Sequence, residues 1–386
     1  MNDIIYLDSA ATTYPKPEEV FVATDECMRK YCGNSGRGSH QLAIATSKKI
    51  YECRSLLADT FGTLPETVVF TQNTTYALNM AILGVLKRAD HVIISNLEHN
   101  SVLRPVYNSY ISKKSDYSVF DAYCGGDCTE EKVLDSIKRL TKKNTRALIC
   151  THTSNICSTS LPIKSIGEYC KKRGIIFILD GAQGAGHSKI DMRDMNVDIL
   201  CLPSHKGLYG PQGCGAMLLS EGILPSEIMF GGSGVNSLSP FMPDEPPEKY
   251  EAGTLPTPAI AGLCEGIKFI QEIGENNISS HEKSLWEYAA HRLEGLGKVK
   301  IYDRSHSGSI LLFNVLGMKS DRVGELLSEM GICVRCGYHC APLAHESLGT
   351  HKDGCGGAIR ASFCAFNTKS DVDALCDGVA EIIKRK

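Results

Sequence analysis

The chain has 386 residues, more than a single small module needs and enough for two or three domains with a substantial core. Its 41 basic and 44 acidic residues give a formal net charge of −3, and this balance argues against a nucleic-acid-binding or membrane-surface protein. The 42% hydrophobic and 22% charged residues are typical of a folded globular protein rather than a disordered one.

Cysteine is the unusual component, with 17 residues. The N-terminus lacks the features of a signal peptide, and no apolar run reaches the roughly 18 residues of a spanning helix. We therefore expect a cytoplasmic protein with reduced thiols. Most of these thiols should be buried, as Cys150 and Cys201 should be inside their apolar runs. The pair Cys124 and Cys128 is expected in a surface turn.

Short apolar runs alternate with amphipathic stretches in the first part of the chain. The runs predict buried strands at residues 67–70, 91–94, 146–150, 175–179 and 198–202. The stretches between them predict helices at residues 75–88, 130–141 and 163–173. This alternation indicates an α/β fold with a mainly parallel sheet, whose ligands bind beyond the carboxyl ends of the strands.

A stretch rich in proline and glycine, residues 231–258, interrupts the alternation. Beyond it the pattern predicts helices at 259–273, 278–296, 321–330 and from 369 onward, and strands at 298–302, 309–315, near 332–335 and at 358–363. We therefore predict a large α/β domain at residues 16–258. A smaller α+β domain should comprise residues 259–386 together with the N-terminal segment 1–15.

Three strand ends carry polar side chains that suit one ligand. Thr74 and Thr75 open a helix, where free backbone N–H groups can hold an anion. Asp180 ends a second strand, and Lys206 follows a third. Each feature alone has an ordinary explanation as a helix cap, a capping aspartate or a surface lysine. Together they match pyridoxal phosphate (PLP), with Asp180 on the ring nitrogen and Lys206 as the Schiff-base lysine.

Eight short motifs extend this match along the chain. They are Tyr6-Leu-Asp-Ser-Ala-Ala, Arg37-Gly-Ser-His40, Glu98-His99-Asn, Ser154-Asn155, Asp180-Gly-Ala-Gln183, Ser204-His-Lys206, Glu251-Ala-Gly-Thr254 and Ile359-Arg360-Ala-Ser. In content and order this set resembles the class V aminotransferase fold and, within it, the cysteine desulfurases and selenocysteine lyases. The resemblance implies PLP-dependent transferase fold type I, with a mainly parallel seven-stranded sheet in the large domain and a smaller α+β C-terminal domain.

The resemblance also implies roles for individual residues. Lys206 would move protons, and His99 would stack on the cofactor ring. The implied cofactor-binding residues are Thr74, Thr75, His99, Asn155, Asp180, Gln183, Ser204, His205, Lys206 and Thr254. The implied substrate-binding residues are His40, Asn155, Arg335 and Arg360. Thr254 is expected to reach the phosphate of a second subunit, so the resemblance implies a homodimer.

The segment Arg335-Cys-Gly-Tyr-His-Cys-Ala-Pro342 resembles the nucleophile loop of the family and places the sulfur acceptor at Cys340. It implies a cysteine desulfurase that forms L-alanine and a persulfide on Cys340, with a sulfur or selenium acceptor protein as partner. L-selenocysteine is an alternative substrate, because the short spacing from Cys340 to Arg360 resembles the group II branch. Arg335 or His339 would favour the thiolate, and the glycines from 349 to 357 are typical of a loop that moves.

Two alternative functions stay open. A class V aminotransferase or epimerase would use Lys206 but not Cys340. A non-enzymatic metal- or redox-binding protein could hold zinc, although only one of the cysteine pairs has zinc-ligand spacing, and we predict no metal site. The residues of that hypothetical zinc site are Cys333, Cys336, His339, Cys340 and Cys355.

Overall fold

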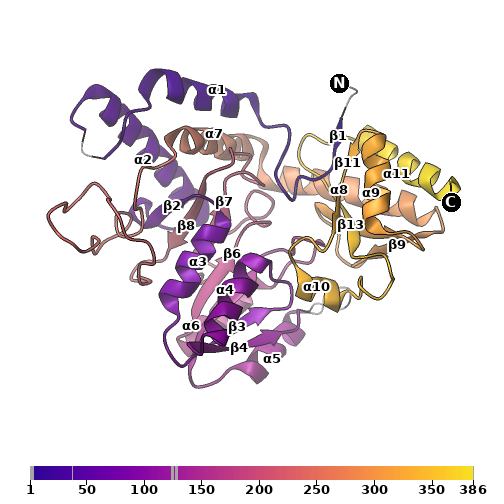
Figure 1. The fold of residues 1–386 in the computed structure, drawn as a ribbon, viewed down its shortest axis with the longest axis horizontal. Coiled ribbons are helices and arrows are strands. Elements are labelled where there is room, and N and C mark those ends of the chain that lie inside the picture. Colours follow the sequence, from indigo (N-terminus) through magenta and orange to yellow (C-terminus); the bar gives the residue numbers. More distant parts are fainter. Residues whose placement is uncertain (1–3, 37, 123–125, 127–128, 386) are drawn as a thin grey trace.

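Two sheets organise the chain into a larger and a smaller lobe (Figure 1). The computed structural model describes residues 4–36, 38–122, 126 and 129–385. Within these residues helices and strands alternate around the larger sheet, so the predicted α/β class is confirmed.

The bounds of the elements follow the sequence pattern closely. The helices are α1 (Glu18–Glu26), α2 (Gln41–Phe61), α3 (Thr74–Val85), α4 (Asn100–Ile111), α5 (Glu130–Leu140), α6 (Ile163–Arg173), α7 (Thr257–Ile273), α8 (Glu275–Glu294), α9 (Ser320–Glu329), α10 (Pro342–Ser347) and α11 (Lys369–Lys384), with the π-helical turn η1 (Cys27–Tyr31) and the 3-10 turn η2 (Pro65–Thr67). The strands are β1 (Ile5–Tyr6), β2 (Val68–Thr71), β3 (Asp90–Ser95), β4 (Ser115–Phe120), β5 (Thr145–Thr151), β6 (Ile176–Asp180), β7 (Ile199–Pro203), β8 (Gly215–Leu219), β9 (Val299–Tyr302), β10 (Ile310–Val315), β11 (Ile332–Cys333), β12 (Arg335–Gly337) and β13 (Ala358–Ser362).

The larger sheet has seven strands in the order β2-β8-β7-β6-β5-β3-β4. The strands from β7 to β4 run parallel, whereas β8 is antiparallel to both of its neighbours. All five strands predicted in this part of the chain belong to this sheet. The sequence analysis did not predict β4 or β8, and the polar composition of β4 fits its position at the edge of the sheet.

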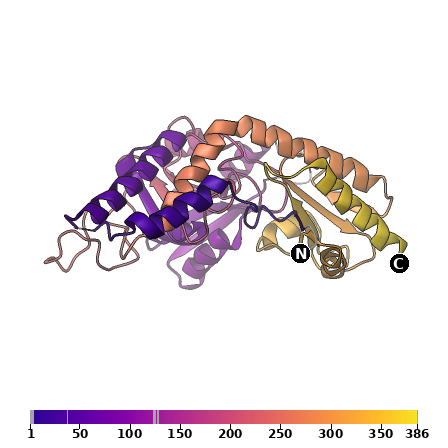
Figure 2. The ribbon, with the colours of Figure 1, turned by 90° about the horizontal axis from the view of Figure 1, so that it is seen from above.

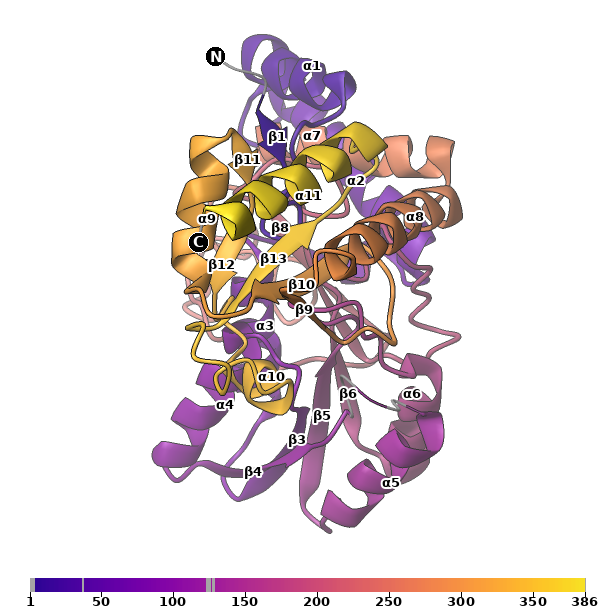
Figure 3. The same ribbon diagram turned by 90° about the vertical axis from the view of Figure 1, so that its right-hand side faces the viewer.

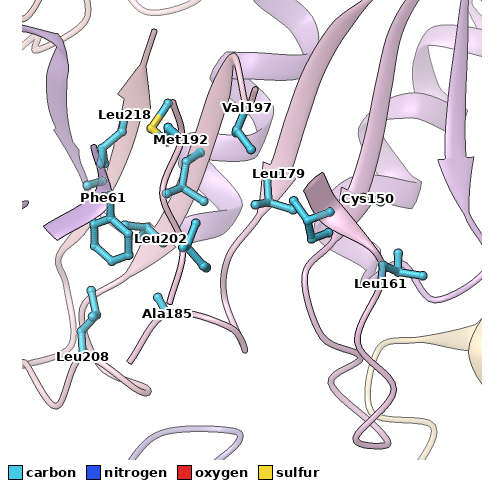
Figure 4. Packing of buried hydrophobic residues seen from close by; sticks show 14 of the residues in the cluster. Phe61, Cys150, Leu161, Leu179, Ala185, Met192, Val197, Leu202, Leu208 and Leu218 are labelled. Carbon is cyan, nitrogen blue, oxygen red and sulfur yellow. The ribbon is translucent and has the colours of Figure 1, made fainter. Parts of the chain in front are cut away.

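Both faces of this sheet are covered, which explains why its inner strands are mainly apolar. On β3, Val92 and Ile94 pack with α3 and α4, whereas Ile93 belongs to the cluster on the opposite face. That second cluster includes side chains of α2, α5, α6 and α7. Figure 4 shows part of it, with Phe61 and Leu202 among its members.

The smaller lobe contains the antiparallel sheet β12-β13-β10-β9, with α8, α9 and α11 packed against it (Figure 3). Its core includes Trp286, whose indole N–H donates to the Ile310 carbonyl at 2.9 Å. The N-terminal segment joins this lobe, because β1 pairs in parallel with β11 and Leu7 lies in the same core.

Helices α7 and α8 run in succession from the larger lobe to the smaller one (Figure 2). The buried side chains of α7 pack in the core of the larger lobe, whereas most of those of α8 pack in the core of the smaller lobe. We therefore propose that the domain boundary lies at Gly274, between the two helices. The boundary at residue 258 stays a prediction from sequence.

Most cysteines that the structure describes are part of the packing. Eleven of these fifteen free thiols are buried, and the predicted burial of Cys150 and Cys201 is confirmed. Cys124 and Cys128 lie outside the described residues. Across the described ranges, no helix combines the length and the apolar character that crossing a bilayer requires.

A buried ion pair connects α2 to the segment before α7. The guanidinium of Arg54 contacts the carboxylate of Glu251, and both side chains are less than a tenth exposed. Glu251 also accepts the backbone N–H of Phe70 at 2.7 Å, and the Arg54 guanidinium lies 4.7 Å from the centre of the Phe70 ring. This pair fixes β2, the strand that leads into α3.

Replacement of Glu251 by alanine should therefore be costly, because it leaves the buried Arg54 charge without its carboxylate counter-ion. We expect Glu251→Ala to lower the free energy of unfolding by about 3–5 kcal/mol in urea titrations. Asp194→Ala is the matched control, because its pair with Lys164 is more than half exposed and should contribute less than about 1 kcal/mol. Equal losses in the two variants would contradict the prediction.

Candidate active site

A cavity of about 190 Å³ opens at the carboxyl ends of β5, β6 and β7. The residues that line it are Asn73, Thr74, Thr75, His99, Ser101, Thr151, Asn155, Asp180, Ala182, Gln183, His205 and Lys206. The structure thus brings together eight residues that the sequence analysis named. Asn73, Ser101, Thr151 and Ala182 were not named in it.

Lys206 and Asp180 provide the two opposite charges of the cavity. Burial lowers the pKa of Lys206 to about 8, and the positive charges of Arg360 and Arg335 act in the same direction while Asp180 opposes them. Burial raises the pKa of Asp180, although the N–H of Ala182 (2.9 Å) and the charge of Lys206 favour its ionised form. Lys206 therefore reaches its neutral, nucleophilic form at a lower pH than an ordinary lysine does.

The N-terminal segment holds the backbone on which Lys206 lies. The His205 carbonyl accepts from the Thr13 N–H (3.0 Å), the Thr12 hydroxyl (3.1 Å) and the Lys16 ammonium (2.9 Å). Close packing leaves no room for a side chain after Lys206, because a Cβ at Gly207 would lie 2.1 Å from a backbone oxygen. None of these N-terminal contacts is predictable from the sequence pattern, because they join residues almost 200 positions apart.

One end of the cavity offers polar atoms that no described residue satisfies. Thr74 and His205 line the cavity, and Ser204 precedes His205 in the chain. The atoms Thr74 Oγ1, Ser204 Oγ and His205 Nδ1 are buried and have no hydrogen-bond partner among the described residues. Helix α3 begins beside them and directs its free N–H groups to the same end of the cavity. Hydroxyl groups and a helix N-terminus together suit an anionic group such as a phosphate.

His99 lies in the wall of the cavity as the N-cap of α4. Its Nδ1 accepts the N–H of Ser101 at 3.0 Å, and the Ser101 hydroxyl lies 2.7 Å from both His99 Nδ1 and Thr75 Oγ1. Burial and the nearby Lys206 lower the pKa of His99 to about 4, so its ring is neutral near pH 7. Ser101 was missed, although its position in the first turn after a capping histidine is a signal that could have indicated it.

Arg360 connects the smaller lobe to this cavity. One of its terminal nitrogens contacts Asp8 Oδ1 at 2.7 Å, and the other donates to the Asn155 carbonyl at 2.8 Å. Its Nε is buried without a partner in the described part of the chain. Asp8 was not predicted as a site residue, yet together with Asn155 it fixes the guanidinium and leaves one N–H edge available.

The loop after β12 carries the exposed thiol of Cys340. The backbone of His339 and Cys340 is left-handed, with φ of +49° and +56°, a conformation that costs about 1–3 kcal/mol for each non-glycine residue. Two contacts hold the loop against the cavity wall. Asn100 N–H donates to the Cys340 carbonyl at 2.7 Å, and the Asn155 side-chain amide donates to the His339 carbonyl at 2.8 Å.

Six residues named from the sequence are not among those that line this cavity: Ser204, Cys340 and Arg360, described above, and three exposed residues. His40 caps α2 and is exposed, and Thr254 is exposed in the segment before α7. Arg335 is exposed on β12, opposite Arg360 in the register of the sheet. Arg37 of the second motif lies outside the described residues.

The structure does not gather the hypothetical zinc ligands into one site. Cys336 packs against Gly324 of α9, and the Cys355 thiol donates to the Asp353 carbonyl at 3.5 Å. In the described residues, the one group with metal-ligand spacing is instead Glu52, Cys264 and Glu265. Two lysine ammonium groups already form ion pairs with those carboxylates.

Comparison with known proteins identifies the family of this fold. A family model described as Aminotransferase class-V matches residues 5–375. The chain belongs to the class-V aminotransferase family. Enzymes of this family use PLP.

The relatives of this class-V chain specify the branch. It is 32% identical over 389 residues to a protein named probable cysteine desulfurase from Methanothermobacter thermautotrophicus, across 99% of this chain and 95% of that protein. The apo structure of a cysteine desulfurase from Thermococcus onnurineus NA1 matches with a TM-score of 0.89 at 30% identity, covering 100% of this chain and 96% of that one. The cysteine desulfurase CsdA (S-sulfonic acid) from Escherichia coli matches with a TM-score of 0.87 at 28% identity, covering 99% and 95%. The resemblance to the cysteine desulfurases and the expected fold type I are confirmed.

A buried ion pair between the lobes supports the Lys206 segment of this class-V chain. His187 Nδ1 contacts Glu282 Oε2 of α8 at 2.8 Å, and a Cβ at Gly207 would lie 2.7 Å from His187 Nε2. Burial alone would lower the pKa of His187, but the charge and hydrogen bond of Glu282 raise it above its ordinary value.

The raised pKa of His187 predicts a stability difference that depends on pH. The pair contributes fully below the unfolded histidine pKa of about 6.5, and its contribution is lost as pH rises through the higher folded pKa. We expect Glu282→Gln to cost about 1.5–3 kcal/mol of unfolding free energy at pH 6 and progressively less at pH 7 and 8. Glu287→Gln, on the exposed side of the same helix, is the control. A cost of Glu282→Gln that stays constant with pH would contradict the assignment.

Proposed function

We propose that this chain binds PLP in the cavity around Lys206 and converts L-cysteine into L-alanine, transferring the sulfur to Cys340 as a persulfide. One observation carries the proposal beyond the family assignment. An exposed thiol lies on a loop whose backbone is hydrogen-bonded to Asn100 and Asn155, at the wall of the cavity that contains Lys206 and Asp180.

The unsatisfied groups of the cavity fit PLP. Thr74, Ser204 and His205 would hold its phosphate with the N-terminus of α3, and Thr75 lies beside them. The carboxylate of Asp180 would hold the ring nitrogen. The neutral ring of His99 can stack on the cofactor face, and Gln183, whose amide donates to the Ala10 carbonyl at 3.0 Å, would reach the ring hydroxyl. When bound, PLP supplies an electron sink that weakens the bonds to the α-carbon of an amino acid.

The residues of the chain perform the remaining steps. The free Nε edge of Arg360, together with Asn155, would hold the substrate carboxylate in the bidentate geometry that arginine favours. Lys206 would take the proton from the α-carbon and return one later. The Cys340 thiolate would then attack the substrate sulfur, so that an S–S bond forms as the C–S bond breaks and the bonding electrons return to carbon, which gains a proton to give alanine.

We infer that the active form is a homodimer. His40 and Thr254 are exposed and lie away from the cavity of their own chain, so each is available to the site of a second copy. Large apolar side chains are also exposed nearby in the sequence, including Phe230 at 71% and Phe241 at 80%. Such side chains are typical of a surface that another protein covers.

The finer identity of the reaction belongs to the same proposal. L-selenocysteine is a second substrate that the Cys340 loop would accept, and the exposed thiol suits transfer of the persulfide to an acceptor protein. A cytoplasmic, reducing location fits the free thiols of the described residues.

The pKa of Lys206 predicts how the apo protein takes up PLP. The neutral amine of Lys206 forms the covalent bond with PLP. The rate of PLP uptake by the apo protein, divided by the rate of the same reaction with a model amine, should therefore be independent of pH below about pH 8 and fall above it. Division by the model amine removes the titration of PLP itself, and the appearance of the visible band measures the rate. Lys206→Ala should show no such band, and Lys189→Ala, at an exposed lysine, should match the wild type. A ratio that stays flat to pH 10 would indicate an ordinary lysine.

Replacement of Cys340 tests the proposed reaction itself. We expect Cys340→Ala to keep the visible band of bound PLP but to form alanine from cysteine at least about 100-fold more slowly, a loss of roughly 3 kcal/mol of transition-state stabilisation. Alanine formation from selenocysteine should persist, because selenium is the better leaving atom. Cys32→Ala, at another exposed thiol, is the control. Unchanged alanine formation from both substrates would refute Cys340 as the nucleophile.

A further inference from the structure

The segment around Cys340 contains a buried chain of side-chain hydrogen bonds that the proposed reaction does not use. His339 Nε2 lies 3.2 Å from the Arg335 carbonyl, and His339 Nδ1 lies 3.1 Å from His345 Nε2. His345 Nδ1 in turn lies 2.7 Å from the Thr350 hydroxyl. All three side chains of His339, His345 and Thr350 are at most 6% exposed, so water cannot replace these contacts.

When both histidine rings are neutral, only one assignment of donors and acceptors satisfies these hydrogen bonds. A carbonyl only accepts, so the Nε2 of His339 must carry its proton, and its Nδ1 is then an acceptor. His345 must therefore donate from Nε2, which leaves its own Nδ1 to accept from the Thr350 hydroxyl at 2.7 Å; the same hydroxyl also lies 3.2 Å from the His345 carbonyl, a second acceptor. Burial, together with the charge of Arg360, lowers the pKa of both histidines, that of His345 to about 4, so the neutral forms prevail near pH 7.

The same chain spans the strained part of the loop. His339 and Cys340 have left-handed backbone conformations, and Arg335 and His345 lie on either side of them. The His345 N–H also donates to the Ala341 carbonyl at 3.1 Å, and the Tyr338 ring packs edge-on against the His345 ring at 5.4 Å. These hydrogen bonds and ring contacts therefore surround the turn at Cys340, the residue that carries the thiol.

We propose that His345 and Thr350 are positioning residues for Cys340, because they hold His339 in the tautomer that bonds the Arg335 carbonyl and so keep the nucleophile loop in its strained conformation beside the cavity. The proposal rests on the proposed function, since it assumes that Cys340 receives the sulfur. The glycines at residues 349–357 were expected to belong to a loop that moves. With residues 335–350 held by these contacts, that movement would take place next to a fixed turn.

The test compares His345→Leu, which removes both ring nitrogens, with His345→Gln, whose amide can still donate to His339 Nδ1. In the holoenzyme we expect His345→Leu to lower kcat for cysteine about tenfold while KM changes less than about twofold, because the loop and not the substrate site is displaced. His345→Gln should recover kcat to within about threefold of the wild type. His351→Gln, at the neighbouring exposed histidine, should behave as the wild type.

Two further measurements separate positioning from loss of fold. Peptide mass spectrometry after a single turnover should find less extra sulfur on Cys340 in His345→Leu, and hydrogen exchange without substrate should be faster at residues 338–341, with the PLP absorbance unchanged. If His345→Leu lowers the thermal midpoint, Thr350→Val replaces it, since it removes the hydroxyl donor at constant shape, and its kcat should fall about two- to threefold.

Wild-type kcat, persulfide yield and exchange rates in a folded His345→Leu or Thr350→Val would overturn the proposal. Loss of all activity in His345→Gln, with retained fold and PLP, would also overturn it, because donation to His339 would then not suffice. Failure of the proposed function would be distinct, since it would be seen as desulfuration retained in Cys340→Ala.

Discussion

The burial of an amine at the end of an apolar sheet is the constraint on which this structure depends. Lys206 lies in a cavity where burial lowers its pKa to about 8, and the carboxylate of Asp180 on the neighbouring strand limits that shift. A buried charge without partners would be costly, and the segments around Lys206 provide contacts that keep it in place. The N-terminal segment holds the backbone of His205, and close packing of Gly207 keeps the turn in place.

The same cavity is completed by the smaller lobe, through a few polar contacts. Arg360 reaches the Asn155 carbonyl, Glu282 pairs with His187, and the Cys340 loop accepts hydrogen bonds from Asn100 and Asn155. Each contact joins an apolar framework in one lobe to a chemically active group in the other. Lys206 follows β7 of the larger lobe, whereas Cys340 precedes α10 and Arg360 lies on β13 in the smaller lobe; Figure 1 labels these three elements.

Much of the fold could be predicted because the larger sheet is covered on both faces. Residues 147–150, for example, are apolar and buried, and the predicted strand at 146–150 matches β5 to within one residue at either end. The strand β4 was missed because its edge position leaves it polar, and α4, which lies between β3 and β4, was missed with it. The helices α1 and α2 were missed because they precede the alternating region. In the site, residues at strand ends such as Asp180 were predicted, whereas Ser101 and Asp8 were not. Ser101 follows no apolar run, and Asp8 reaches Arg360 only because β1 pairs with β11 of the smaller lobe.

The sequence by itself determined the positions of five of the seven strands of the larger sheet and the chemistry at the ends of β6 and β7, because both are local. A strand that is covered on both faces needs an apolar run, and the residues after such a run face the ligand edge of the sheet. Only the tertiary structure decided how the distant parts complete the site. Asp8 and Arg360 are 352 positions apart and meet through the pairing of β1 with the smaller lobe. The fixed turn at Cys340 likewise depends on a directed chain of buried hydrogen bonds, and hydrogen-bond direction is a property of three-dimensional contact that no pattern of residue types contains.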